Sequence, residues 1–118
     1  MRTVQDLERN LEAFTGTENY YRHWTGSLVY TDGVKYLAEK AGAHWLIDAV
    51  ASWQPRVKDS YFQIWELRVN DDRSAVLTMK EDTDEPEKVR QKIPFTDFPL
   101  EYIKLYCIDG VLLLPSEY

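Results

Sequence analysis

The sequence predicts an α+β fold in which three N-terminal helices pack on one face of a four- to five-stranded, mainly antiparallel sheet. Two observations lead to this class. Apolar residues recur at helical spacing before Ser60, as an amphipathic helix requires. After Ser60 apolar and polar residues alternate, which is typical of half-buried strands.

Glycine and proline mark where each predicted helix ends. The three helices are expected over about residues 4–15, 32–41 and 43–54. Gly16 and Gly42 follow the first two helices, and Pro55 follows the third because proline lacks the amide hydrogen of a continuing helix. The aromatic stretch 17–24 shows no clean period, so we expect it to be irregular.

The second half of the chain has strand and turn signals in succession. Strands are expected over about residues 61–69, 75–81, 88–93, 102–108 and 111–114. Asp109 and Gly110 predict a tight hairpin between the last two, since both positions tolerate positive φ. The acidic segment 81–87 is too charged to be anything but a solvated loop.

The composition is that of one ordinary globular domain. The chain has 118 residues, of which 44% are hydrophobic and 29% charged, and no repeat or linker divides it. The single cysteine, Cys107, lies in an apolar segment and is expected to be a buried small hydrophobe. We therefore expect no disulfide, no metal site and no cofactor.

The net charge and the hydropathy of the sequence restrict the partners and the cellular compartment that we expect. The net charge of −6 argues against bulk attraction to nucleic acid, because phosphate binding usually needs a basic surface. The N-terminus has no apolar stretch of signal-peptide length, and the longest apolar run, 111–114, is too short to cross a bilayer. These observations predict a cytoplasmic protein that does not enter a membrane.

One stretch of the sequence resembles a known family. The segments TGTENYYRHW and LVYTDGVKYLAEKAGAHWLIDAVASWQ are similar to the signature of small bacterial and mobile-element proteins catalogued as a domain of unknown function. The resemblance is specific over about residues 14–54 and extends loosely through the strands. It implies a compact small domain and brings no activity, substrate or catalytic residue with it.

The first candidate site comes from the alternation of the strands. If the apolar residues face the helices, the opposite face carries Glu66, Arg68, Lys80, Lys88, Arg90, Lys92, Lys104 and Tyr106. A positive surface on an acidic chain would fit an acidic protein or a nucleic-acid backbone. The alternative is a solvated face whose bases pair with the loop 81–87.

The second candidate site uses both histidines of the chain. His23, His44 and Asp48 could bind a metal or act as a general base. The alternative is chance, because a His–Asp pair four residues apart is common on helix surfaces.

The third candidate is the turn 31–33. A helix that begins there could present Asp32 and free amide groups to a ligand or anion. No phosphate-binding motif accompanies it, and the alternative is an ordinary helix cap.

Two classes of function remain. The first is a non-enzymatic binding module that engages a macromolecule, an acidic protein or else a nucleic acid, through the basic sheet face or exposed aromatics. A homodimer through the same surface is a further option. The second is a small hydrolytic or metal-dependent enzyme that uses His23, His44 and Asp48, together with Asp32 of the turn 31–33. We favour the first because no nucleophile, base or ligand cluster stands at diagnostic spacing.

Overall fold

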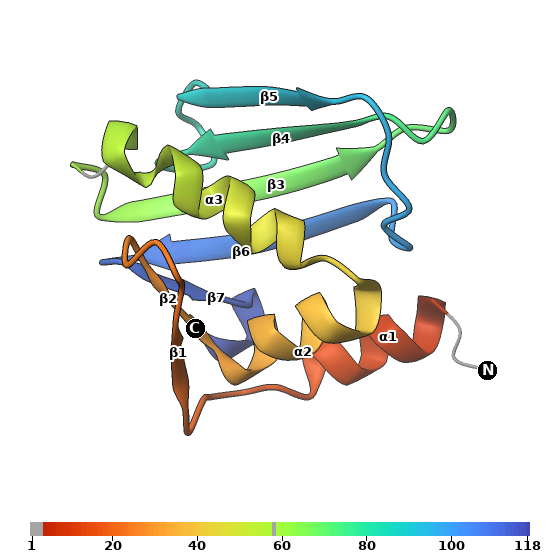
Figure 1. Ribbon diagram of the computed structural model, residues 1–118, viewed down its shortest axis with the longest axis horizontal. Helices are drawn as coiled ribbons and strands as arrows, with labels where there is room; N and C mark the ends of the chain where they lie inside the picture. Colours follow the sequence, from red (N-terminus) through yellow and green to blue (C-terminus); the bar gives the residue numbers. More distant parts are fainter. Residues whose placement is uncertain (1–3, 58) are drawn as a thin grey trace.

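The computed structural model describes residues 4–57 and 59–118 and has an α+β fold (Figure 1). The helices are α1 (Val4–Glu12), α2 (Asp32–Ala41) and α3 (His44–Val57), followed near the C-terminus by a short 3₁₀ turn, η1 (Pro115–Glu117). The strands are β1 (Tyr20–Arg22), β2 (Val29–Thr31), β3 (Phe62–Val69), β4 (Ala75–Lys80), β5 (Val89–Ile93), β6 (Tyr102–Ile108) and β7 (Val111–Leu113). The described residues therefore form three helices and one sheet.

The sheet is larger than predicted. It has seven strands in the order β1-β2-β7-β6-β3-β4-β5, and it is mixed because β2 pairs with β7 in parallel. The prediction of four or five strands missed β1 and β2, which have three residues each and are too short to show a period. The strands β3 to β7 begin and end within one residue of the predicted ranges.

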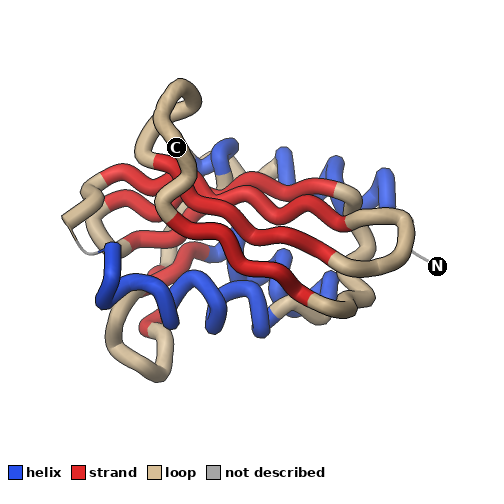
Figure 2. Tube along the Cα trace, turned by 90° about the horizontal axis from the view of Figure 1, so that it is seen from above, coloured by secondary structure: helices blue, strands red, loops and turns tan. Residues whose placement is uncertain are grey.

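Two of the helices cover one face of the strongly twisted sheet (Figures 1 and 2). Val34 and Leu37 of α2 and Val50 of α3 are buried there with Trp65 and Leu105 of the central strands. The predicted arrangement is only partly right, because α1 lies beside α2 and beyond the edge of β6. At this edge, β7 pairs with the C-terminal part of β6 and leaves the N-terminal part of β6 without a neighbouring strand on this side among the described residues. Residues of α1 and η1 line a groove beside this N-terminal part.

The ends of two helices differ from the prediction for physical reasons. α1 ends at Glu12, and the next two amides bond to carbonyls three residues earlier, which tightens the chain into a turn. α3 runs through Pro55 to Val57. Pro55 leaves the carbonyl of Ala51 without its helical donor, and the hydroxyl of Ser27 donates to that carbonyl instead, at 3.2 Å.

A buried polar cluster fixes α3 on β3. The side-chain amides of Gln54 and Gln63 bond to each other at 2.9 and 3.1 Å, and the indole N–H of Trp65 donates to Gln63 at 2.8 Å. All three residues are buried. Because a buried amide without a partner costs about 1–3 kcal/mol, this cluster favours one position of the helix on the strand.

The bond from Ser27 to α3 can be tested with a double-mutant cycle. Ser27→Ala should lower the free energy of unfolding by about 1 kcal/mol, because the Ala51 carbonyl loses its only side-chain donor. In a Pro55→Ala background the restored amide can bond to that carbonyl, so the same serine substitution should cost less. Urea unfolding of the four proteins measures the coupling, and equal costs in both backgrounds would contradict this account.

Candidate functional site

The face of the sheet that α2 and α3 leave uncovered is the first candidate site, here called the open face. Cross-strand partners share a face, so the register decides which side chains lie on it. Arg90, Thr78, Glu66 and Lys104 form one row across four strands, and Lys92, Val76, Arg68 and Tyr102 form the next. Lys80, Ile64, Tyr106 and Leu113 form a third row.

The bases of the open face fall into two groups. Arg68 pairs with Glu66 at 3.3 Å, Lys88 with Glu81 at 2.9 Å, and Arg90 with Glu87 at 2.9 Å. Lys80, Lys92 and Lys104 form no ion pair within residues 4–57 and 59–118. Three of the six predicted bases therefore lack an ion pair among the described residues, although Lys104 stands directly opposite Glu66 on the neighbouring strand.

The position of Lys88 differs from the prediction. Strand β5 begins at Val89, although the amide of Lys88 still donates to the carbonyl of Met79 at 2.7 Å, and the ammonium group of Lys88 reaches Glu81 in the preceding loop. The same carboxylate accepts a hydrogen bond from Ser60 at 2.6 Å, and these contacts lower the pKa of Glu81. The acidic loop 81–87 thus neutralises part of the positive charge of the open face, as the alternative interpretation expected.

Aromatic rings border the charged rows. Phe62, Tyr106 and Tyr118 contact one another with ring centroids 5.1 to 5.7 Å apart. Tyr102 donates to Glu66, and its ring lies 5.0 Å from the guanidinium of Arg68. Burial, with the nearby carboxylate second, raises the pKa of Tyr102 well above its usual value. Tyr118 is the most exposed of these rings and could touch a partner without rearrangement.

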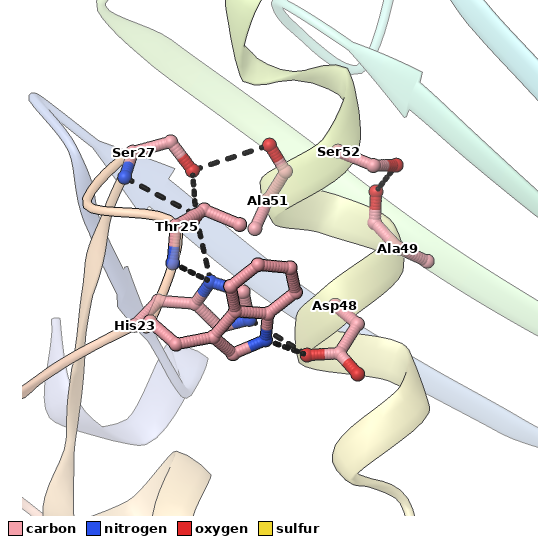
Figure 3. A network of polar contacts seen from close by, with 8 residues as sticks. His23, Thr25, Ser27, Asp48, Ala49, Ala51 and Ser52 are labelled. Carbon is pink, nitrogen blue, oxygen red and sulfur yellow. Dashed lines mark hydrogen bonds and ion pairs between the residues drawn. The ribbon is translucent and has the colours of Figure 1, made fainter.

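The second candidate site is a chain of polar contacts between the β1–β2 turn and α3 (Figure 3). His23 Nε2 lies 2.7 Å from Asp48 Oδ1, and Nδ1 lies 2.7 Å from the hydroxyl of Thr25. The backbone N–H of Thr25 also points to Nδ1 at 3.2 Å. Both ring nitrogens of His23 therefore have partners within the chain.

This series of contacts contains the groups of a catalytic triad, but its histidine is buried. His23 is only 4% exposed, and its two ring nitrogens contact Thr25 and Asp48. His44 lines the same hollow of about 340 Å³, and among the described residues no hydrogen bond joins it to His23 or Asp48. In the part of the chain that the structure describes, no three His, Cys, Asp or Glu residues are grouped to hold a metal ion.

Asp32 does not belong with the histidines. It lines a different hollow and organises the preceding loop, accepting bonds from the amides of Glu18 and Asn19 and from the hydroxyl of Tyr21. The bond from Tyr21 is the main reason that the pKa of Asp32 falls to about 2. The predicted set of His23, His44, Asp48 and Asp32 is therefore divided between two places.

The turn at the start of α2 does receive an anion, which is a carboxylate of the chain itself. Glu117 accepts from the hydroxyl of Thr31 at 2.6 Å and from the amide of Gly33 at 3.1 Å. A carboxylate is stabilised at this position by the free amides and the dipole of the helix. Sequence reasoning missed Glu117 because it lies far along the chain from the turn that it caps.

Cys107 behaves as expected from its apolar surroundings. The residue is fully buried, and burial raises the pKa of its thiol to about 12. A thiol in this state is neutral at physiological pH and does not act as a nucleophile. Cys107 is therefore part of the core.

Comparison with known proteins places the chain in a family. The model of a family of unknown function, DUF6876, matches residues 5–118. The chain belongs to DUF6876. The resemblance noted over residues 14–54 is thereby confirmed and extends over nearly the whole chain. No curated protein and no solved structure matches it.

The DUF6876 domain also lacks a transmembrane helix within its described residues. None of its helices combines the length and the apolar composition needed to cross a bilayer. Since the family carries no assigned activity, the arguments about function below rest on the geometry of this chain.

The low pKa of Asp32 predicts a pH-dependent contribution to stability. A carboxylate whose folded pKa lies near 2, below its usual 3.8, stabilises the fold above pH 3.8 and loses this effect as the pH falls through 2. Asp32→Asn should therefore destabilise the protein near pH 7 and have little effect near pH 2. Urea unfolding across this range measures the difference. Equal destabilisation by Asp32→Asn at both ends of the range would contradict this account.

The close approach of the C-terminus to α2 predicts an unusual effect of alanine. A Cβ added at Gly33 would lie 2.6 Å from both Glu117 Oε1 and Leu114 Cδ1. Gly33→Ala should thus lower stability by about 1–3 kcal/mol, although alanine normally favours a helix. Gly16→Ala is the control because no atom lies within 4 Å of its added Cβ. Thermal unfolding that shows equal effects for both variants would refute the contact.

Proposed function

We propose that the chain is a non-enzymatic binding module that docks an acidic protein on the open face of its sheet. The observation that carries this proposal is that Lys80, Lys92 and Lys104 lie on the face that α2 and α3 leave uncovered, without described ion-pair partners. The chain as a whole has a net charge of −6, so its positive charge is segregated rather than in excess. Such segregation orients a partner of opposite charge and speeds its association.

An acidic protein fits this face better than a nucleic acid. Phosphate-backbone binding draws its affinity from many released counterions and usually needs a strongly basic surface. Here the pairs of Arg68, Lys88 and Arg90 with glutamates leave only three lysines uncompensated. Three free charges suit a partner whose own carboxylates supply the complement, with Tyr118 and Tyr102 available as contact rings.

The alternatives have less support. A hydrolytic enzyme built on this site would need a substrate to reach His23, which is only 4% exposed. A twofold homodimer through the open face would bring its basic rows against each other, which is unfavourable for like charges. We propose that the interaction takes place in the cytoplasm, where an unpaired buried thiol such as Cys107 is ordinary.

Charge reversal on the open face tests the proposal. Lys80→Glu/Lys92→Glu/Lys104→Glu should bind immobilised poly-glutamate roughly tenfold more weakly than the unaltered protein at low salt, since three surface pairs of about 0.2–1 kcal/mol are lost. The matched control, Arg9→Glu/Arg22→Glu/Lys40→Glu, has the same net charge and alters exposed bases elsewhere. It should retain most of the affinity.

Comparing the two triple variants distinguishes an effect of the open face from an effect of net charge alone. Equal losses in both triple variants, or no retention of the unaltered protein on the resin, would contradict the proposal. A pull-down from the native host with the unaltered protein and the open-face variant then identifies the partner. Recovery of nuclease-sensitive nucleic acid in place of an acidic protein would favour the other class of macromolecule.

A further inference from the structure

Strand β5 ends the sheet, and its outer edge is unoccupied. It pairs with β4 on one side, and no strand among the described residues pairs with it on the other (Figure 1). Its backbone N–H and C=O groups that point away from β4 are therefore free to form a further ladder. Exposed edges of this kind accept extended peptides in several known modes of recognition.

The two faces of this edge differ in chemistry. Arg90 and Lys92 project on the open face, with Lys88 immediately before them. On the face covered by α3, the side chains of Ser52, Trp53, Arg56 and Gln91 line a hollow of about 270 Å³. Along β5, the basic side chains on one face therefore alternate with the hollow on the other face. Successive side chains of an incoming strand would alternate between the same two faces.

The hollow is held in shape by its own contacts. The indole N–H of Trp53 donates to Gln91 Oε1 at 2.7 Å, which joins α3 to β5. The guanidinium of Arg56 lies 5.4 Å from the centre of the Trp53 ring. A side chain entering beside Gln91 would meet an aromatic wall and a cation, so an apolar or acidic group would fit there.

We propose that β5 receives an extended acidic segment of the partner protein as an additional strand. Carboxylates at alternate positions of the segment pair with Arg90 and Lys92, and the side chain between them enters the hollow lined by Trp53 and Arg56. The backbone ladder supplies affinity, and the alternation selects the sequence. This inference rests on the proposed function and assigns its partner a binding mode.

A second copy of the chain is a poor occupant of the same edge. Antiparallel pairing of two β5 strands centred on Gln91 would place Arg90 of one copy opposite Lys92 of the other, twice. Like charges directly opposite each other destabilise a strand pair, and basic edge residues protect natural sheets from this association. An acidic strand would instead be attracted to these basic side chains.

Backbone methylation distinguishes a strand partner from a loose electrostatic contact. The probe is a short capped peptide that alternates Glu with Val, compared with two versions N-methylated at every second residue, in either phase. Methylation on the side that faces β5 should weaken binding at least tenfold, whereas methylation on the far side should have little effect. Hydrogen exchange should show new protection of the outward β5 amides when the unmethylated peptide is bound.

A charge exchange tests the pairing of side chains. Arg90→Glu/Lys92→Glu should lose affinity for the Glu peptide and gain affinity for a peptide in which Lys replaces each Glu. If all the Glu peptides bind equally and the β5 amides gain no protection, the inference is wrong, while binding to the open face still stands. If none of them binds the unaltered protein, the proposed function falls as well.

Discussion

The pairing of β3 with β4 on one side and with β6 on the other is the constraint on which the rest of the structure depends. Its register places Trp65 and Leu67 beneath the helices and Arg68 on the opposite face. Since side chains alternate along a strand, a slip of one residue would exchange the two sets. The core and the basic face are thus two consequences of one alignment, and neither can change without the other.

Polar contacts then attach the remaining elements to this frame. Ser27 bonds to the carbonyl that Pro55 leaves free, and in the same turn His23 bonds to Asp48 of α3. A hydroxyl, an imidazole and a carboxylate in series invite comparison with catalytic triads. Here the imidazole is only 4% exposed, and the series ties the β1–β2 turn to α3.

The distribution of charge links the fold to its proposed role. The acidic loop before β5 pairs with Lys88 and Arg90, while Lys80, Lys92 and Lys104 form no ion pair among the described residues. The loop lies beside the strand that we propose as the docking edge. Any acidic partner must therefore compete with Glu81 and Glu87, which favours partners with several carboxylates over single anions.

The sequence by itself determined the helices, the strands after residue 60 and the side chains that share each strand face, because periodicities of 3.6 and 2 are properties of neighbouring residues. Only the tertiary structure decided the rest. Strands β1 and β2 are too short to carry a period; β2 depends on pairing with β7, and β1 on pairing with β2. The cap on α2 by Glu117 and the bond between His23 and Asp48 join distant segments, and no local pattern encodes such contacts.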